Sequence, residues 1–106
     1  MLAACTLIAR WMKGVTPERF FADDQLRSAV AMQLIVIGEG ARCLSDTTKA
    51  EAPEVPWRAV VNMRHRLAHG YGRASAVILM DTAAQWVPQL APPLRSLLDA
   101  LGPDET

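Results

Sequence analysis

The chain has 106 residues, 51% of them hydrophobic, which suits one small domain with a single core and excludes a mainly disordered chain. Eleven Lys and Arg balance eleven Asp and Glu. The zero net charge argues against a uniformly basic nucleic-acid binder and an acidic tail protein, and it permits self-association. We expect residues 1–106 to form one domain.

The first apolar stretch predicts a helix over roughly 2–13, which ends at Gly14, a residue suited to a helix C-terminus. The longest predicted helix follows at roughly 23–45, with Asp23 or Asp24 as its N-cap. Apolar residues recur along it at helical spacing, at Leu26, Val30, Leu34, Ile37, Ala41 and Leu44.

This long helix is apolar on more than one side. Met32, Ile35 and Val36 extend the apolar surface beyond the stripe just described. A helix with a wide apolar surface is buried on more than one side. In so small a chain, this pattern predicts a homodimer interface.

The third predicted helix begins near Pro56 and runs to Ala68 or His69, before Gly70. The fourth begins at Ser75 as its N-cap. We expect Pro88 to kink it and the prolines at 92–93 to break or restart it. Strand signals are weak, so the expected fold is an all-α antiparallel four-helix bundle with a kinked or broken C-terminal helix.

Neither a membrane span nor a disulfide scaffold is expected. No apolar run approaches the roughly 18 residues of a membrane-spanning helix, and the apolar start lacks the basic region of a signal peptide. Cys5 and Cys43 are too few for a disulfide framework, and their apolar surroundings predict buried, reduced thiols. The expected location is the cytoplasm.

Positive charge is concentrated in one segment. Residues 56–80 contain four arginines and no acidic residue, so this segment carries +4 and the rest of the chain −4. The arginines are Arg58, Arg64, Arg66 and Arg73. Residues 64–71 (RHRLAHGY) combine two arginines, two histidines and the chain's single tyrosine, which makes them the candidate functional site.

These residue types suit phosphodiester chemistry. An arginine can clamp a phosphate and stabilise charge that develops on it. A histidine, with an unperturbed pKa of about 6.5, can move protons in either direction near neutral pH. RNA carries its own nucleophile in the 2′-hydroxyl, so neither a metal nor a protein nucleophile is required. Tyr71 can stack on a base or bind a phosphate.

Two plainer interpretations stay open on these residues alone. The helix dipole by itself favours basic residues near a helix C-terminus. His65 and His69 have the i, i+4 spacing of zinc ligands, but the flanking arginines repel a cation and no carboxylate is adjacent, so neither metal nor cofactor is expected. Arg64 and His69 stand about 140° apart on an ideal helix, so they share one site only if the helix ends near His69 or two copies meet.

The motifs resemble those of HepT-type toxins, which belong to the HEPN-domain family. Arg64, His69 and Tyr71 match the R-x4-H-x-Y motif of that family. Residues 37–41 (IGEGA) resemble its I-G-E-A segment. Residues 55–64 (VPWRAVVNMR) resemble its I-P-W-x-x-I-x-G-M-R segment, with Asn62 in place of the usual Gly. The resemblance covers about residues 20–100.

The resemblance implies a homodimeric, metal-independent ribonuclease, expected to act as an endonuclease, whose two motifs line a cleft between the subunits. Such toxins are silenced by a minimal nucleotidyltransferase antitoxin that transfers AMP to the motif tyrosine. On this basis Arg64 would bind the scissile phosphate and His69 would act as general acid or base. Tyr71 would hold RNA and accept AMP.

Other residues take supporting parts in this interpretation. His65, Arg66 and Arg73 are candidates for RNA contact, with a plain surface role open for His65. Glu39 would hold the guanidinium of Arg64 in place, because an Arg facing an apolar core needs a partner.

The chain also departs from the family pattern. Residues 72–75 form a shorter loop after the motif, without the usual Asp. The alternative function is therefore a non-catalytic subunit that binds a nucleotide or the nucleotidyltransferase. A purely structural helical dimer is a third possibility. Trp57 is expected to pack between helices.

Overall fold

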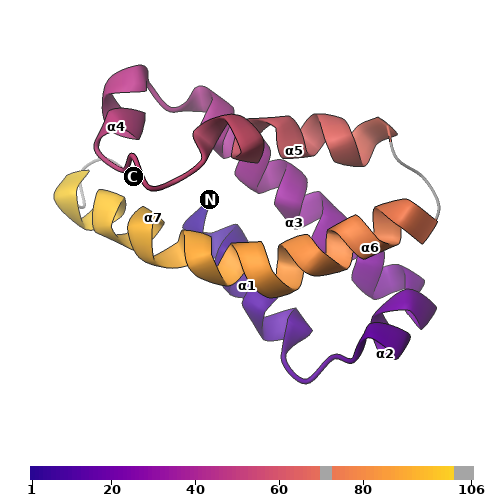
Figure 1. The fold of residues 1–106 in the computed structure, drawn as a ribbon. Helices are drawn as coiled ribbons and strands as arrows, with labels where there is room; N and C mark the ends of the chain where they lie inside the picture. The colour runs from indigo at the N-terminus through magenta and orange to yellow at the C-terminus, as the bar shows by residue number, and fades with distance from the viewer. Residues whose placement is uncertain (70–72, 102–106) are drawn as a thin grey trace.

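The fold was obtained as a computed structural model, which describes residues 1–69 and 73–101. Within these ranges, the following side chains lie outside the description: Arg64, Arg66, Ala68, His69, Arg73, Ala74, Ser75 and Leu101. The described residues form helices and no strand, which confirms the expected all-α bundle. The elements are α1 (Leu2–Met12), α2 (Pro17–Ala22), α3 (Asp24–Cys43), α4 (Asp46–Ala50), α5 (Trp57–His69), α6 (Arg73–Asp81), the π-helical turn η1 (Thr82–Trp86) and α7 (Val87–Leu101) (Figure 1).

Local signals set the ends of the first long helices as predicted. Gly14 follows α1 with a φ of 73°, a left-handed conformation that costs glycine little. The Asp23 carboxylate accepts a hydrogen bond of 3.0 Å from the backbone N–H of Leu26 and so caps α3.

Two short helices were not predicted. The Thr16 hydroxyl accepts from the N–H of Arg19 and caps α2, which begins at Pro17. The Ser45 hydroxyl caps α4 by accepting from the N–H of Thr48. Helices of six and five residues are too short for an apolar period to reveal, although their caps are readable in the sequence.

The C-terminal segment differs from the prediction in two ways. Helix α6 begins at Arg73, so Ser75 is not the N-cap. The prolines at 92–93 lie inside α7 and do not break it, and the irregular turn is η1 instead. An interior proline costs about 3 kcal/mol, but α7 buries its apolar face, and this packing offsets the loss. The buried residues are Val87, Leu90, Leu94 and Leu97.

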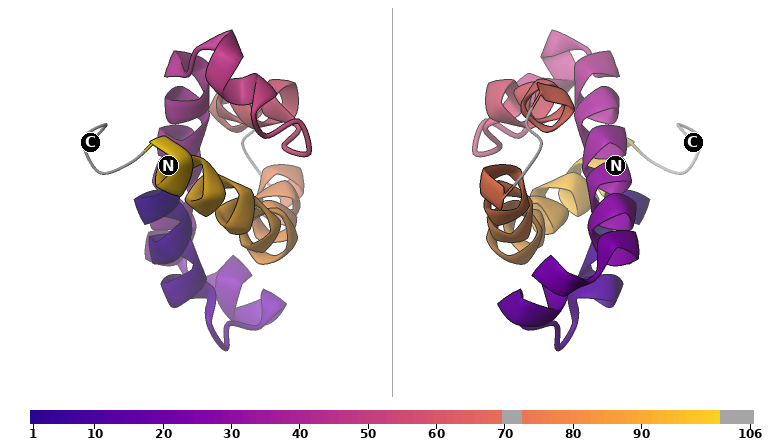
Figure 2. Two further views of the ribbon diagram at one scale, coloured as in Figure 1. Left: turned by 90° about the vertical axis from the view of Figure 1, so that its left-hand side faces the viewer. Right: turned by 90° about the vertical axis from the view of Figure 1, so that its right-hand side faces the viewer.

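Helix α3 has the most extensive contacts of any helix in the bundle. It packs most extensively on α5 and α1, and α1 in turn packs on α7 (Figure 2). Ile8, Phe20 and Leu34 are fully buried in the resulting core. Cys5 is buried as predicted, but Cys43 is exposed, which corrects the expectation of two buried thiols. Ala41 faces the core, whereas Cys43, two residues further along α3, lies on the other side of the helix and faces solvent.

Candidate functional site

Helix α5 carries the candidate motif and is anchored at its first residue. The indole N–H of Trp57 donates to the backbone oxygens of Lys49 and Ala52, at 2.9 and 3.1 Å. Further along the helix, Val60 and Met63 are buried in the core. Trp57 therefore has the packing role that was predicted, and these contacts fix where the motif-bearing helix starts.

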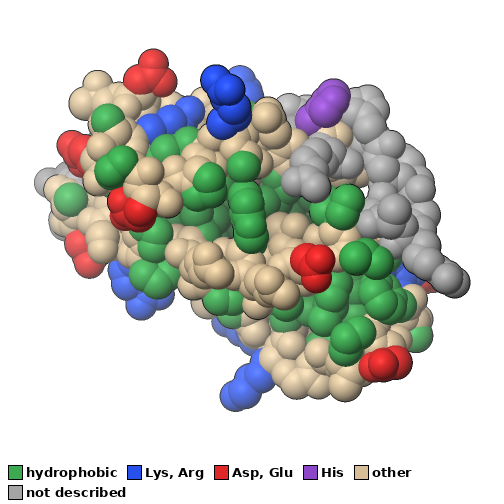
Figure 3. All heavy atoms as spheres, in the orientation of Figure 1, with side chains coloured by type: hydrophobic (Ala, Val, Ile, Leu, Met, Phe, Trp, Pro, Cys, Tyr) green, Lys and Arg blue, Asp and Glu red, His purple; other side chains and the backbone are tan. Residues whose placement is uncertain are grey.

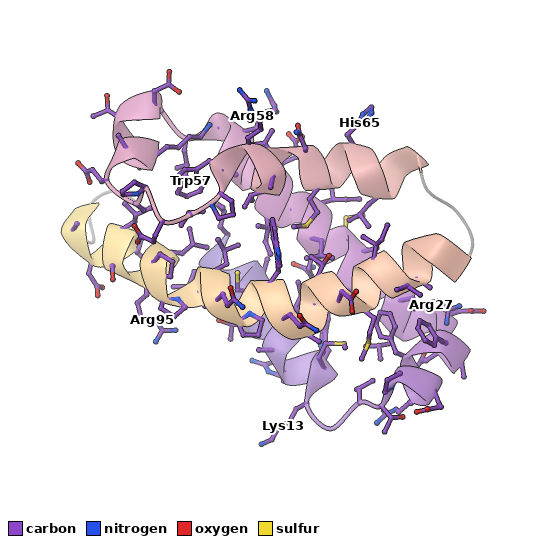
Figure 4. The ribbon with its side chains drawn as sticks, viewed as in Figure 1. Lys13, Arg27, Trp57, Arg58, His65 and Arg95 are labelled. Atoms are coloured by element: carbon purple, nitrogen blue, oxygen red, sulfur yellow. The ribbon has the colours of Figure 1, made fainter. Side chains whose placement is uncertain are left out.

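The outer face of α5 is polar. Arg58, Asn62 and His65 recur at i, i+4 and i+7 and are all exposed. Figure 4 shows Arg58 and His65 extending from the same side of α5, away from the bundle. Because residues 56–80 contain no acidic residue, this face belongs to the positively charged part of the chain.

The predicted catalytic residues occupy the C-terminal half of α5. Arg64 and His69 both belong to this helix, and their backbone positions are about 140° apart around its axis. Arg66 lies between them, and Arg73 begins α6. The C-terminal end of α5 and the start of α6 lie at the same end of the molecule (Figure 1). The side chains of these four residues, and Tyr71 entirely, lie outside the described part of the structure.

Glu39 is placed on α3, the helix on which α5 packs. Its Oε2 lies 3.1 Å from Nη2 of Arg42, one helical turn away. This hydrogen bond, with the attraction between the charges, raises the pKa of Arg42. The expected contact of Glu39 with Arg64 stays a prediction, since the Arg64 side chain is not described.

A groove opens between α5 and the C-terminal helical segment. Helix α5 packs on α3 and makes little backbone contact with α6, η1 or α7. Figure 3 shows hydrophobic side chains along the hollow between them, with an acidic group beside them. One cavity here measures about 250 Å³ and is lined by Ala59, Met63, Leu67, Ile78, Asp81, Thr82, Gln85 and Trp86.

A second, smaller cavity of about 160 Å³ adjoins the first, and Trp86 lines both. The lining residues between positions 78 and 93, including Trp86, belong to no motif identified in the sequence. A Trp with polar neighbours indicates a binding site only once the fold shows that its side chain is exposed and lines a groove. The sequence does not show this for Trp86.

Among the side chains described, no three His, Cys, Asp or Glu residues gather in a group able to hold a metal ion. Within residues 1–69 and 73–101, no helix is long and apolar enough to cross a membrane.

Comparison with known proteins gives consistent matches. The model of the ribonuclease HepT-like family matches residues 1–97. A protein of Thermococcus cleftensis, named as a probable ribonuclease HepT, is 31% identical over 82% of this chain and 79% of its own length. A candidate RNase of Caldanaerobacter subterraneus subsp. tengcongensis is 28% identical over 92% of this chain and 88% of its own. A candidate RNase of Methanocaldococcus jannaschii is 26% identical over 85% of this chain and 83% of its own length. No solved structure matches.

Proposed function

Because the chain belongs to the HepT-like ribonuclease family, we propose that it is the toxin of a toxin–antitoxin system and a metal-independent endoribonuclease. The observation that carries this proposal is the family match over residues 1–97, which includes the complete R-x4-H-x-Y motif at 64–71. The partner is a minimal nucleotidyltransferase antitoxin, which silences the site by transferring AMP to Tyr71.

The proposed reaction uses the substrate's own nucleophile. His69 of one subunit takes the proton of the 2′-hydroxyl, and the 2′-oxygen attacks the adjacent phosphorus. The bond from phosphorus to the 5′-oxygen breaks, and the partner's His69 gives that oxygen a proton. Arg64 stabilises the negative charge that develops on the phosphate. The products are a 2′,3′-cyclic phosphate and a 5′-hydroxyl.

Two observations favour a site shared by two copies. Arg64 and His69 are about 140° apart on α5, which is wide for one phosphate to be held by both in one subunit. Helix α3 exposes 57% of Met32 and 42% of Val36, an apolar face suited to a second copy. His65, Arg66 and Arg73 then contact the RNA on either side of the cut.

The test is RNA cleavage in excess EDTA by wild type, Arg64→Ala and His69→Ala, on total tRNA and a long mRNA. Intact mass confirms beforehand that Tyr71 carries no AMP, and circular dichroism confirms folding. We expect each variant to lose at least about a hundredfold in rate, the usual scale for a general acid or base at His69 and for a charge-stabilising group at Arg64. Arg95→Ala, an exposed arginine on α7, is the charge-matched control and keeps wild-type activity.

Full activity in His69→Ala would overturn the ribonuclease proposal. Folded, unmodified wild type that binds nucleotide or the nucleotidyltransferase but never cleaves RNA would establish the alternative, a non-catalytic subunit. The antitoxin relationship has its own readout: the nucleotidyltransferase with ATP adds AMP to wild type and not to Tyr71→Phe.

A further inference from the structure

Trp86 borders open space on two sides. It lines the cavity of about 250 Å³ beside Met63 and Ile78, and also the adjoining cavity of about 160 Å³ beside Val60 and Leu90. The side chain remains 37% exposed. A large aromatic ring with space beside it is a surface on which another flat ring can stack.

The polar groups around this ring are unused. The indole N–H of Trp86, the Asp81 carboxylate and the Gln85 amide form no hydrogen bond or ion pair within the part of the chain that the structure describes. By contrast, the N–H of Trp57 is bonded to two carbonyls, and the Thr82 hydroxyl donates to the Ile78 oxygen at 2.7 Å. The groove thus presents donors and acceptors next to an aromatic surface.

The size and charge of the groove select the kind of ligand. Its larger cavity, at about 250 Å³, falls below the range of about 300–1,000 Å³ typical of drug-sized ligands, so it suits a single flat ring system. Among the residues whose side chains the structure describes, no Lys or Arg lines either cavity, and Asp81 would repel a phosphate. A neutral heterocycle fits these walls better than a phosphate does.

The groove follows the helix that carries the motif. Met63 and Leu67 of α5 line it, and Leu67 lies two residues before His69. An RNA strand held at the end of α5 can therefore place a neighbouring base in the groove. Single-stranded RNA is commonly recognised by stacking of a base on an aromatic side chain, with hydrogen bonds to the base edge.

We propose that this groove is a base-specificity site, in which Trp86 stacks on an RNA base and Asp81 selects a base with an exocyclic amino group. Carboxylates accept hydrogen bonds from the cytosine amino group, and Gln pairs with the adenine edge. Uracil has no exocyclic amino group and is disfavoured. The inference rests on the proposed function, because it takes RNA as the ligand.

Binding without cleavage gives the first test. Fluorescein-labelled hexamers of 2′-O-methyl A, C and U lack the free 2′-hydroxyl, so fluorescence anisotropy reports affinity alone. We expect wild type to bind the A and C hexamers at least about fivefold more tightly than U, the lower end of discrimination by one base contact. Trp86→Ala and Asp81→Ala lose this preference. Leu98→Ala and Asp99→Ala, exposed positions on α7, keep it as matched controls.

A second measurement covers the case in which Trp86→Ala fails to fold. In ¹⁵N-labelled wild type, the A hexamer shifts the indole N–H resonance of Trp86, assigned with Trp86→Phe, and leaves that of Trp57 in place. Equal affinity of wild type for all hexamers, an unchanged preference in folded Trp86→Ala, or an unmoved Trp86 resonance each overturns the inference.

The cleavage assay separates the two proposals. Cleavage that depends on His69, with no base preference traceable to Trp86, overturns the groove assignment and leaves the ribonuclease. Base preference that depends on Trp86, in a protein that cleaves no RNA, overturns the ribonuclease and leaves the groove as a base-binding site.

Discussion

The indole nitrogen of Trp57 lies 2.9 Å from the backbone oxygen of Lys49, which joins the start of α5 to the end of α4. The same N–H reaches the oxygen of Ala52. We expect Trp57→Phe to lower the free energy of unfolding by about 1–3 kcal/mol, because two partly buried carbonyls lose their donor. Trp86→Phe removes an N–H that has no such partners, so we expect it to lower the free energy of unfolding by less. Urea denaturation compares the two, and equal losses contradict the anchoring role.

The exposed face of α3 gives a prediction about assembly. Met32→Glu or Val36→Glu places a charge in the proposed interface and is expected to convert dimers to monomers, because an unpaired charge is costly to bury. Phe21→Glu, at a side chain also 42% exposed but on α2, is the control and leaves dimers intact. Sedimentation equilibrium measures the mass. Dimers that persist in both α3 variants place the interface elsewhere.

Glu39 offers a test of the proposed support for Arg64. Glu39→Gln is expected to slow RNA cleavage at least tenfold while the fold remains intact, since Arg64 loses a charged partner. Arg42→Ala removes the exposed ion pair seen on α3 and is expected to keep cleavage near the wild-type rate, because surface pairs contribute little. Similar losses in both variants would show that Glu39 acts through Arg42.

The buried thiol predicts alkaline sensitivity. Burial raises the pKa of Cys5 above its ordinary value of 9.0. The folded state then holds the thiol proton more tightly than the unfolded state does. The contribution of the protonated thiol to stability is therefore complete below the pKa that Cys5 has in the unfolded state. This contribution is lost as the pH rises through the pKa that Cys5 has in the folded state.

Cys5→Ala is therefore expected to flatten the fall in the free energy of unfolding above pH 9, the ordinary value of the thiol pKa. Cys43→Ala, at an exposed thiol, keeps the wild-type slope. Urea titrations at stepped pH between 8 and 10.5 provide the comparison. A slope unchanged in Cys5→Ala would mean that other groups cause the alkaline loss.

The elements that local chemistry specifies were predictable. Asp23 caps α3 and Gly14 ends α1, because a side-chain acceptor and a left-handed residue act on their immediate neighbours. The effect of the prolines at 92–93 was predicted wrongly, because local chemistry does not decide it. Their penalty is local, whereas the burial that outweighs it comes from helices distant in the sequence.

The candidate site was likewise predictable from the sequence only in part. The spacing of Arg64, His69 and Tyr71 is a property of the sequence, so the motif was found there. The groove was not, because Met63 and Trp86 are far apart along the chain and line one cavity only through the placement of α5 relative to η1.

The π-helical turn η1 sets the phase between the two halves of the last helical segment. Helix α6 packs on α3 and α2, whereas α7 packs on α1. If Thr82–Trp86 wound as regular α-helix with no change in length, one half would rotate against the other by about 100°, so both could not keep their contacts. A related chain that lacks one residue at this turn should therefore run through it as regular α-helix and keep the packing of both α6 and α7.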